Sequence, residues 1–122
     1  MSFSDAVRSA LLQNYANFRG RALRSEFWWF MLAFALVSVL AALIDDIALR
    51  GYSVLETIVT IGAILPTLAV GARRLHDIDR SGWWQLLQVV PLIGAIILIV
   101  WFASLGTVGV NRFGPPPVPT AV

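Results

Sequence analysis

Residues 27–44 read Phe-Trp-Trp-Phe-Met-Leu-Ala-Phe-Ala-Leu-Val-Ser-Val-Leu-Ala-Ala-Leu-Ile, a run of 18 residues without a charged side chain. As an α-helix this run is roughly 27 Å long, which suits a bilayer hydrocarbon core of about 30 Å. A buried helix of a soluble protein would carry polar side chains on one face, and here the notable polar residue is Ser38. The run therefore predicts a transmembrane helix in an all-α integral membrane protein.

The composition of the whole chain supports a membrane location. Of the 122 residues, 58% are hydrophobic and only 13% are charged, whereas a soluble domain is about half apolar and a quarter charged. Such a chain is neither disordered nor a coiled coil, and its composition argues against a soluble enzyme. Cysteine is absent, which excludes disulfides and thiolate chemistry. We expect a single membrane domain over residues 1–122, with no cofactor, metal or nucleic-acid partner.

Two further apolar segments follow the first. Residues 54–72 reach the length of a span, and residues 83–105 form a longer uncharged run interrupted by Pro91 and Gly94. The sequence thus predicts a small bundle of three transmembrane helices, over 27–44, 54–72 and 83–105. In the alternative, residues 83–90 form a half-helix that turns back at Pro91, which leaves two spans plus a re-entrant or broken third.

The arginines predict the orientation in the bilayer. Seven of the nine arginines lie before the first run or between the second and third, and the other two are Arg50 and Arg112. By the positive-inside rule, the N-terminus and the 73–82 segment are cytoplasmic. Three spans would place the C-terminal tail outside, whereas the alternative keeps it in the cytoplasm. Four tryptophans would anchor the cytoplasmic interface: Trp28, Trp29, Trp83 and Trp84. Trp101 would lie at the opposite interface.

The two ends of the chain differ from its middle. Within the cytoplasmic segment 1–24, apolar residues recur at three- and four-residue steps, at Phe3, Val7, Leu11, Tyr15 and Phe18. This pattern predicts an amphipathic interfacial helix, capped by Ser2 or Ser4, and packing on neighbouring protein is the alternative. Residues 106–122 are rich in Pro and Gly and are predicted to form a flexible, irregular tail.

Polar residues cluster where the first and third runs begin. Ser25 and Ser81 are each placed to cap a helix before paired tryptophans. In the second cluster, continued helix would put Asp77 within reach of Arg73, Arg74 and Arg80. His76 and Asp77 would point about 100° apart on such a helix, which makes them a poor catalytic pair.

Anchoring to phosphates and to the headgroup layer is the simplest interpretation of these clusters. A more specific hypothesis, beyond anchoring, is a site for anionic lipid headgroups or other anions. Its candidate residues are Arg19, Arg21, Arg24, Arg73, Arg74, His76, Asp77 and Arg80.

Five motifs in order carry a family resemblance: Asn17-Phe18-Arg19-Gly20-Arg21, Arg24-Ser25-Glu26-Phe27-Trp28, Arg73-Arg74-Leu75-His76-Asp77, Ser81-Gly82-Trp83-Trp84 and Asn111-Arg112-Phe113-Gly114-Pro115. Over residues 14–117 the chain resembles the domain of unknown function 805 family of small bacterial inner-membrane proteins. An acidic residue usual in that family is replaced here by Pro116. The resemblance implies a multi-span protein of the bacterial inner membrane with no assigned activity, and it implies no catalytic residues.

We therefore expect a non-enzymatic inner-membrane protein whose cytoplasmic Arg/Trp face binds anionic lipid or a partner protein. One alternative is an oligomeric transporter or channel subunit, in which Pro66 and Pro91 break helices near mid-membrane. Against it, the predicted spans contain a single ionisable side chain, Glu56 near the outer end of the second. The other alternative is a membrane enzyme that uses His76 and Asp77 on lipid headgroups. A homo-oligomer would pack through the small residues Ala63, Thr67 and Gly71.

Overall fold

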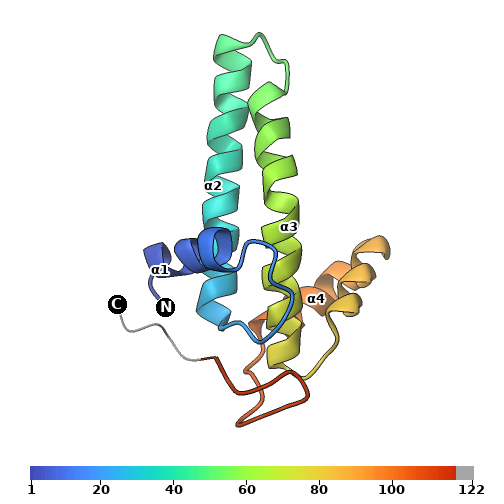
Figure 1. The fold of residues 1–122 in the computed structure, drawn as a ribbon. Helices are drawn as coiled ribbons and strands as arrows, with labels where there is room; N and C mark the ends of the chain where they lie inside the picture. The colour runs from blue at the N-terminus through green and yellow to red at the C-terminus, as the bar shows by residue number, and fades with distance from the viewer. Residues whose placement is uncertain (118–122) are drawn as a thin grey trace.

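The computed structural model describes residues 1–117 and consists of helices joined by short loops. In chain order the elements are α1 (Phe3–Arg8), the π-helical turn η1 (Ser9–Gln13), α2 (Arg24–Ala48), α3 (Val54–Asp77), the 3-10 helix η2 (Gly82–Val89) and α4 (Ile93–Ala103). No strand forms within the described residues, so the expected all-α class is confirmed there. Helices α2 and α3 stand as a long antiparallel pair, and the other elements gather around one end (Figure 1).

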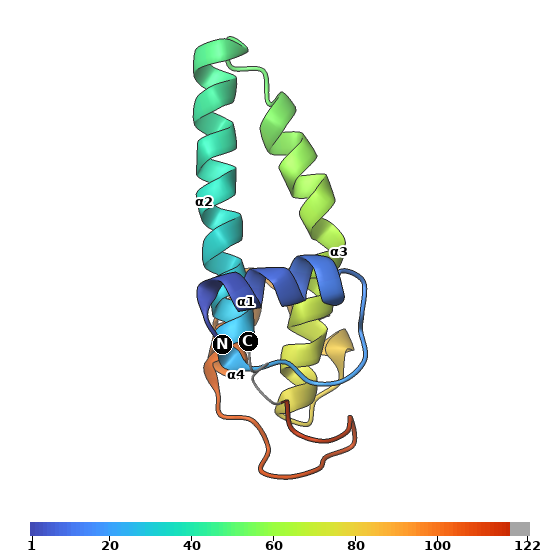
Figure 2. The ribbon, with the colours of Figure 1, turned by 60° about the vertical axis from the view of Figure 1, so that its left-hand side comes forward.

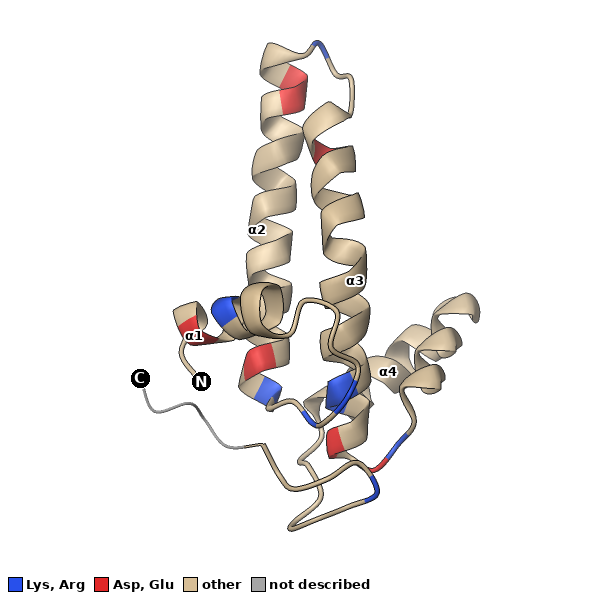
Figure 3. Cartoon of the chain, viewed as in Figure 1, with Lys and Arg blue, Asp and Glu red and all other residues tan. Residues whose placement is uncertain are grey.

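Helices α2 and α3 are both long and apolar enough to cross a membrane. At 1.5 Å per residue, their 25 and 24 residues span about 37 and 36 Å. They contain the runs 27–44 and 54–72 from which two spans are predicted. Charged residues lie toward the two ends of the pair and leave its middle uncharged (Figure 3). We call the end at Arg24 and Asp77 the basal end, and the end at Ala48 and Val54 the distal end.

A carboxylate of α2 caps the start of α3 at the distal end. Ser53, at the N-cap position of α3, makes no side-chain cap. Asp45 instead accepts hydrogen bonds from the backbone N–H groups of Leu55 (2.9 Å) and Glu56 (3.0 Å). These two donors would otherwise lack partners in the first turn of α3, and the negative charge also suits the positive end of the helix dipole. This cap fixes the hairpin between the two long helices.

The three-span bundle is not confirmed, because residues 83–105 do not form one helix. Pro91 has no backbone N–H, and the chain turns back between η2 and α4 at Leu92, whose φ is +65°. Helix α4 has 11 residues and is about 16 Å long, half the thickness of the hydrocarbon core. Trp101 packs edge-on against Trp84 with ring centroids 5.6 Å apart. The expectation that Trp101 lies at the opposite interface from Trp84 is therefore wrong.

The N-terminal segment crosses α2 and α3 near the basal end (Figure 2). Ser2 caps α1 as expected, accepting from the N–H of Asp5 (3.2 Å). The face of α1 and η1 that is buried carries the small residues Ala6 and Ala10, both fully covered. The predicted apolar stripe is half-exposed, with Phe3 and Leu11 at 42% and 38% exposure. The segment thus packs on the hairpin through small residues and leaves larger apolar side chains outward.

A hydrogen bond joins this segment to the middle of α3. Pro66 has no N–H to donate to the carbonyl of Gly62, which precedes it by one helical turn. The Tyr15 hydroxyl donates to that carbonyl at 2.6 Å. An unpaired carbonyl is costly in a membrane, so this contact satisfies the group that the proline frees.

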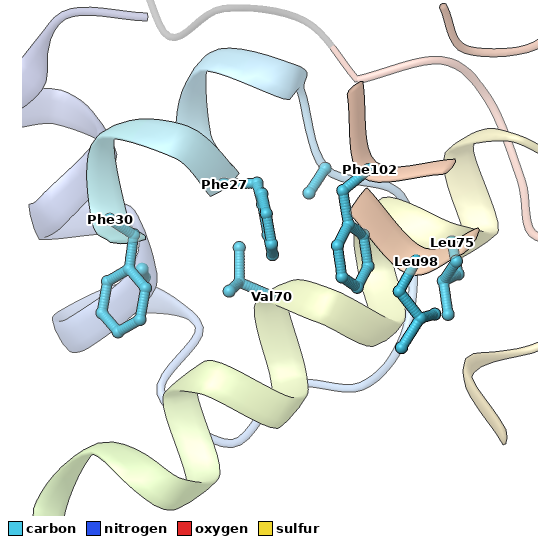
Figure 4. Packing of buried hydrophobic residues seen from close by; sticks show 8 residues of the cluster. Phe27, Phe30, Val70, Leu75, Leu98 and Phe102 are labelled. Carbon is cyan, nitrogen blue, oxygen red and sulfur yellow. The ribbon is translucent and has the colours of Figure 1, made fainter. Parts of the chain in front are cut away.

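The hydrophobic core lies at the basal end, where α2, α3 and α4 meet. Phe27 of α2 and Phe102 of α4 pack with ring centroids 4.3 Å apart. Figure 4 shows this cluster, which also includes Ala10 and Ala22. Its members from the three helices are Phe27, Phe30, Val70, Leu75, Leu98 and Phe102. This packing holds α4 against the lower part of the hairpin and positions the polar groups below it.

Candidate functional site

Five charged side chains are buried together at the basal end. Their exposed fractions are 7% or less, although each belongs to a residue type that is almost never buried unless it is paired. The five are Arg21, Glu26, Arg73, Arg74 and Asp77. They come from the loop before α2, the first turn of α2 and the last turn of α3. Three guanidiniums share this volume with two carboxylates, so the cluster carries a surplus of positive charge.

Arg73 pairs with Glu26 rather than with Asp77. Its Nη1 donates to both carboxylate oxygens of Glu26, at 2.9 and 2.8 Å, and its Nε donates to the backbone carbonyl of Asn17 at 3.1 Å. The hydroxyl of Ser9 also donates to Glu26, at 3.1 Å. This ion pair ties α2, α3 and η1 together. The prediction that Arg73 shares the Asp77 carboxylate is therefore wrong.

Asp77 is held between two arginines from distant parts of the chain. Arg74, three residues earlier on α3, pairs with one carboxylate oxygen, as its spacing predicts. Arg21 donates from Nε to the other oxygen at 2.8 Å. Arg74 also donates to backbone carbonyls of Ala22 (2.7 Å) and Phe102 (3.0 Å), which links the start of α2 to the end of α4.

The segment after α4 folds under this cluster. Arg21 donates to the carbonyls of Thr107 (2.6 Å) and Gly109 (2.7 Å), and the N–H of Thr107 donates to the carbonyl of Asp77 (2.7 Å). A Cβ at Gly106 would overlap the Asp77 carboxylate, so this close approach requires glycine. The flexible tail was predicted over 106–122. Thr107 and Gly109 of this segment accept hydrogen bonds from the buried Arg21, and residues 118–122 lie outside the described residues.

His76 is engaged in structural contacts. Its Nδ1 is hydrogen-bonded to the carbonyl of Gly20 at 2.9 Å, and its ring stacks on Phe113 with centroids 4.0 Å apart and planes 3° from parallel. A carbonyl only accepts hydrogen bonds, so Nδ1 carries the proton in this arrangement. His76 and Asp77 contact different partners, which agrees with the divergent directions predicted for adjacent helical residues.

Four further arginines lie around the buried cluster: Arg19, Arg24, Arg80 and Arg112. Arg80 does not reach Asp77 as predicted; its guanidinium lies 4.2 Å from the centroid of the Trp101 ring, a cation–π contact. Arg112 forms an exposed ion pair with Asp79 at 3.1 Å, and this hydrogen bond lowers the pKa of the Asp79 carboxyl. Arg19 and Arg24 are exposed, and Arg24 donates to the carbonyl of Ala103 at 3.2 Å. The predicted site residues therefore divide into a buried network and an exposed rim.

Of the two serine caps predicted before the paired tryptophans, only one forms. Ser81 is the N-cap of η2 and accepts from the N–H of Trp83 at 3.3 Å. Ser25 lies inside α2, which begins at Arg24, so it caps nothing. All four tryptophans predicted as interface anchors are exposed, between 39% and 79%: Trp28, Trp29, Trp83 and Trp84.

An open groove on the outside of the basal end combines exposed Arg24 with Trp28 and Trp29. Its volume is about 520 Å³, and Ser25, Leu32 and Ala103 complete its lining. One cationic group thus stands at its polar end, with indole rings and an aliphatic side chain beyond it. The arrangement provides a charged donor beside an apolar surface. We call it the Arg24 groove.

Three structural roles are not evident from the sequence patterns. Glu26, in the first turn of α2, suits the positive end of the helix dipole, but its main contact is the ion pair with Arg73. Asp45 follows the first apolar run directly, and no local sequence pattern indicates that it caps α3. Tyr15 reads as one member of an apolar stripe. For Tyr15 a signal did exist, because Pro66 necessarily leaves the carbonyl of Gly62 without a helical partner.

Comparison with known proteins shows that the chain is similar in sequence to bacterial inner membrane proteins. The chain is 46% identical over 111 residues to the inner membrane protein YhaH of Escherichia coli strain K12, covering 88% of this chain and 92% of that protein. It is 44% identical over 108 residues to the inner membrane protein YhaI of the same strain, with the same coverage. The uncharacterized protein YiiR is 32% identical over 124 residues, covering 80% of this chain and 84% of that protein.

No solved structure matches the chain. The names of YhaH and YhaI, together with the two apolar helices, support a location in the bacterial inner membrane. Residues 15–115 match the family described as "Protein of unknown function (DUF805)". They include every charged residue of the buried cluster and the Arg24 groove. The chain belongs to this family.

Proposed function

We propose that this protein is a non-enzymatic inner-membrane protein that binds the phosphate of anionic lipids in the Arg24 groove. The observation that carries the proposal is the exposed Arg24 guanidinium at the start of a membrane-length helix, flanked by Trp28 and Trp29. Arginine forms charge-assisted hydrogen bonds to phosphate, and indole rings favour the headgroup layer. Leu32, one turn further along α2, continues the groove toward the depth of the acyl chains.

Among the arginines near the groove, Arg24 is the one available to bind a lipid phosphate, because the buried arginines are already paired. Arg21, Arg73 and Arg74 have side-chain exposures of 1%, 4% and 0% and are committed to carboxylates and carbonyls. They therefore hold the fold together and do not line the Arg24 groove. Arg24 has a single protein partner, a backbone carbonyl, and keeps most of its donors free for a headgroup.

The orientation in the bilayer belongs to the same proposal. The basal end carries most of the arginines, which favours the cytoplasmic side for it. The η2–α4 hairpin is too short to cross and begins and ends beside the basal cluster (Figure 1). It therefore enters one leaflet as a re-entrant element. In this orientation the Arg24 groove lies at the cytoplasmic headgroup layer, where anionic lipids attract basic side chains.

The alternative functions receive less support from the contacts. A headgroup enzyme would need His76 and Asp77 free to act, and both are occupied, by Gly20 and Phe113 and by two arginines. A transport site at the proline break of α3 would use the freed carbonyl of Gly62, which Tyr15 already occupies. Both contacts favour a binding role over chemistry or transport.

The test is lipid retention by the Arg24→Gln variant. The intact protein in nanodiscs containing phosphatidylglycerol and phosphatidylcholine is analysed by native mass spectrometry, and the affinity for phosphatidylglycerol is titrated. Removal of one charge-assisted contact of about 1.5–3 kcal/mol predicts an affinity loss of about tenfold or more.

Arg8→Gln is the matched control, because Arg8 is exposed on α1 and lies outside the groove. It should retain phosphatidylglycerol like the unmodified protein. Equal affinities for the two lipids, or an Arg24→Gln variant as tight as Arg8→Gln, would contradict the proposal.

A further inference from the structure

A second pocket lies beside the buried cluster, on the side of η1 and the loop before α2. Its volume is about 330 Å³. Its lining is mainly polar and includes Ser9, Gln13, Arg19, Glu26 and Arg73. We call it the Arg73 pocket. It shares no lining residue with the Arg24 groove, so the two sites can be tested separately.

The charges around this pocket do not balance. Glu26 is the carboxylate in its lining, and both its oxygens already accept from Arg73. Arg21, which also lines the pocket, is paired with Asp77. Arg19 is exposed at the rim and forms no ion pair with the described residues. The pocket therefore presents an unneutralised guanidinium beside a buried cluster that already has more cations than anions.

Arg73 also has an unused donor. Its Nη2 is buried and has no hydrogen-bond partner among the described residues, although Nε and Nη1 are both bonded. Leaving a buried charged donor unpaired costs more than an ordinary hydrogen bond contributes. An acceptor oxygen in this pocket, close to Arg73, would remove that cost.

The backbone that lines the Arg73 pocket at η1 has an unusual conformation. η1 is a π-helical turn in which the N–H of Asn14 donates to the carbonyl of Ser9, five residues earlier, at 2.8 Å. This wider turn places Ser9, Gln13 and Asn14 together on the pocket lining. π-helical turns are rare and occur frequently at functional sites. Gln13 adds an amide to the lining.

We propose that the Arg73 pocket binds a phosphate group. The guanidinium of Arg19 neutralises the charge of the phosphate, and the Gln13 amide supplies a further donor. A small shift of the atoms that cover Nη2 of Arg73 lets a phosphate oxygen accept from it. A cation is disfavoured by the surplus of arginine. Lipid headgroups and soluble phosphate compounds present the same chemistry, and the pocket is large enough for either.

The test uses the full chain and the Arg19→Gln variant. Arg19 is exposed, and its interaction with the protein runs through its backbone N–H, so this substitution leaves the fold intact. In detergent, we expect inorganic phosphate to raise the Tm relative to chloride at equal ionic strength. Its dissociation constant should rise about tenfold or more in Arg19→Gln. In nanodiscs, retention of phosphatidic acid is measured for the same two proteins.

The two measurements distinguish the sources of phosphate. An Arg19-dependent effect of inorganic phosphate supports a soluble ligand, and Arg19-dependent retention of phosphatidic acid alone supports a headgroup. Arg24→Gln should leave the effect of inorganic phosphate unchanged. In an Arg24→Gln background, Arg19→Gln should still lower the retention of phosphatidic acid, so failure of the Arg24 groove leaves this proposal standing. The proposal is overturned if neither ligand binds, or if the exposed control Arg8→Gln weakens binding as much as Arg19→Gln.

Discussion

At the scale of single residues, the basal end depends on carboxylates shared by buried guanidiniums. Asp77 is 5% exposed and receives Arg21 and Arg74 from elements separated by more than fifty residues in the chain. A buried ion pair is a small net gain when complete, but removing one partner leaves an uncompensated charge. Asp77 is therefore a structural residue of the arginine cluster.

We predict that Asp77→Asn lowers the free energy of unfolding by about 3–5 kcal/mol, because two guanidiniums then lose their counter-charge. Thermal unfolding in detergent measures the change. Asp79→Asn is the matched control, since the Asp79–Arg112 pair is exposed, with side chains 42% and 66% accessible. A Tm for Asp77→Asn that equals that of the control would show that the cluster does not stabilise the protein.

Part of this cluster is predictable from spacing. The three-residue step from Arg74 to Asp77 predicts their contact, and the structure contains it. Similar spacings wrongly predict that Arg73 and Arg80 also reach Asp77. Helical spacing shows only which partners are within reach on one helix, and here Glu26 and Trp101 from other elements take the two arginines.

At the scale of elements, α3 tolerates a proline because another element supplies the missing donor. Pro66 is fully buried in a helix long enough to span the bilayer, and the carbonyl it frees accepts from Tyr15. The same contact fixes the N-terminal segment across the hairpin. Pro66 therefore interrupts the backbone hydrogen bonds of α3, and the carbonyl that it frees holds the N-terminal segment against α3.

We predict that Tyr15→Phe destabilises the protein by about 1 kcal/mol, the usual net value of one hydrogen bond. Tyr52→Phe, at an exposed distal tyrosine, should have no effect. In a Pro66→Ala background, the restored N–H satisfies Gly62 and the cost of Tyr15→Phe should fall. A double-mutant cycle on Tm values in detergent measures this coupling, and additive effects would contradict the contact.

At the scale of the whole molecule, the two long helices separate an arginine-rich end from an acidic one. The η2–α4 hairpin returns to the basal end, and the segment after it hydrogen-bonds to Arg21 there (Figure 1). Both the N-terminal segment and residues 106–117 are thus at one end of the hairpin. We expect them to face the cytoplasm together.

Single cysteines test this topology, because the chain contains none of its own. Ser4→Cys marks the N-terminal segment, Val108→Cys the segment after α4, and Tyr52→Cys the distal loop; Val108 and Tyr52 are 98% and 73% exposed. With an impermeant maleimide on spheroplasts, we expect only Tyr52→Cys to react. Labelling of Val108→Cys together with Tyr52→Cys would instead indicate that residues 83–105 cross the membrane.

The sequence by itself determined the all-α class, the two long apolar helices and the family. These features follow from hydrophobic length and ordered local motifs, which need no knowledge of distant contacts. Only the tertiary structure decided that residues 83–105 break into η2 and α4 and which arginines are buried. Hydropathy measures how apolar a segment is, and residues 83–105 fit either one span or a break at Pro91. The pairs Arg73–Glu26 and Arg21–Asp77 join residues far apart in the chain. Packing brings these residues together, so local patterns cannot specify them.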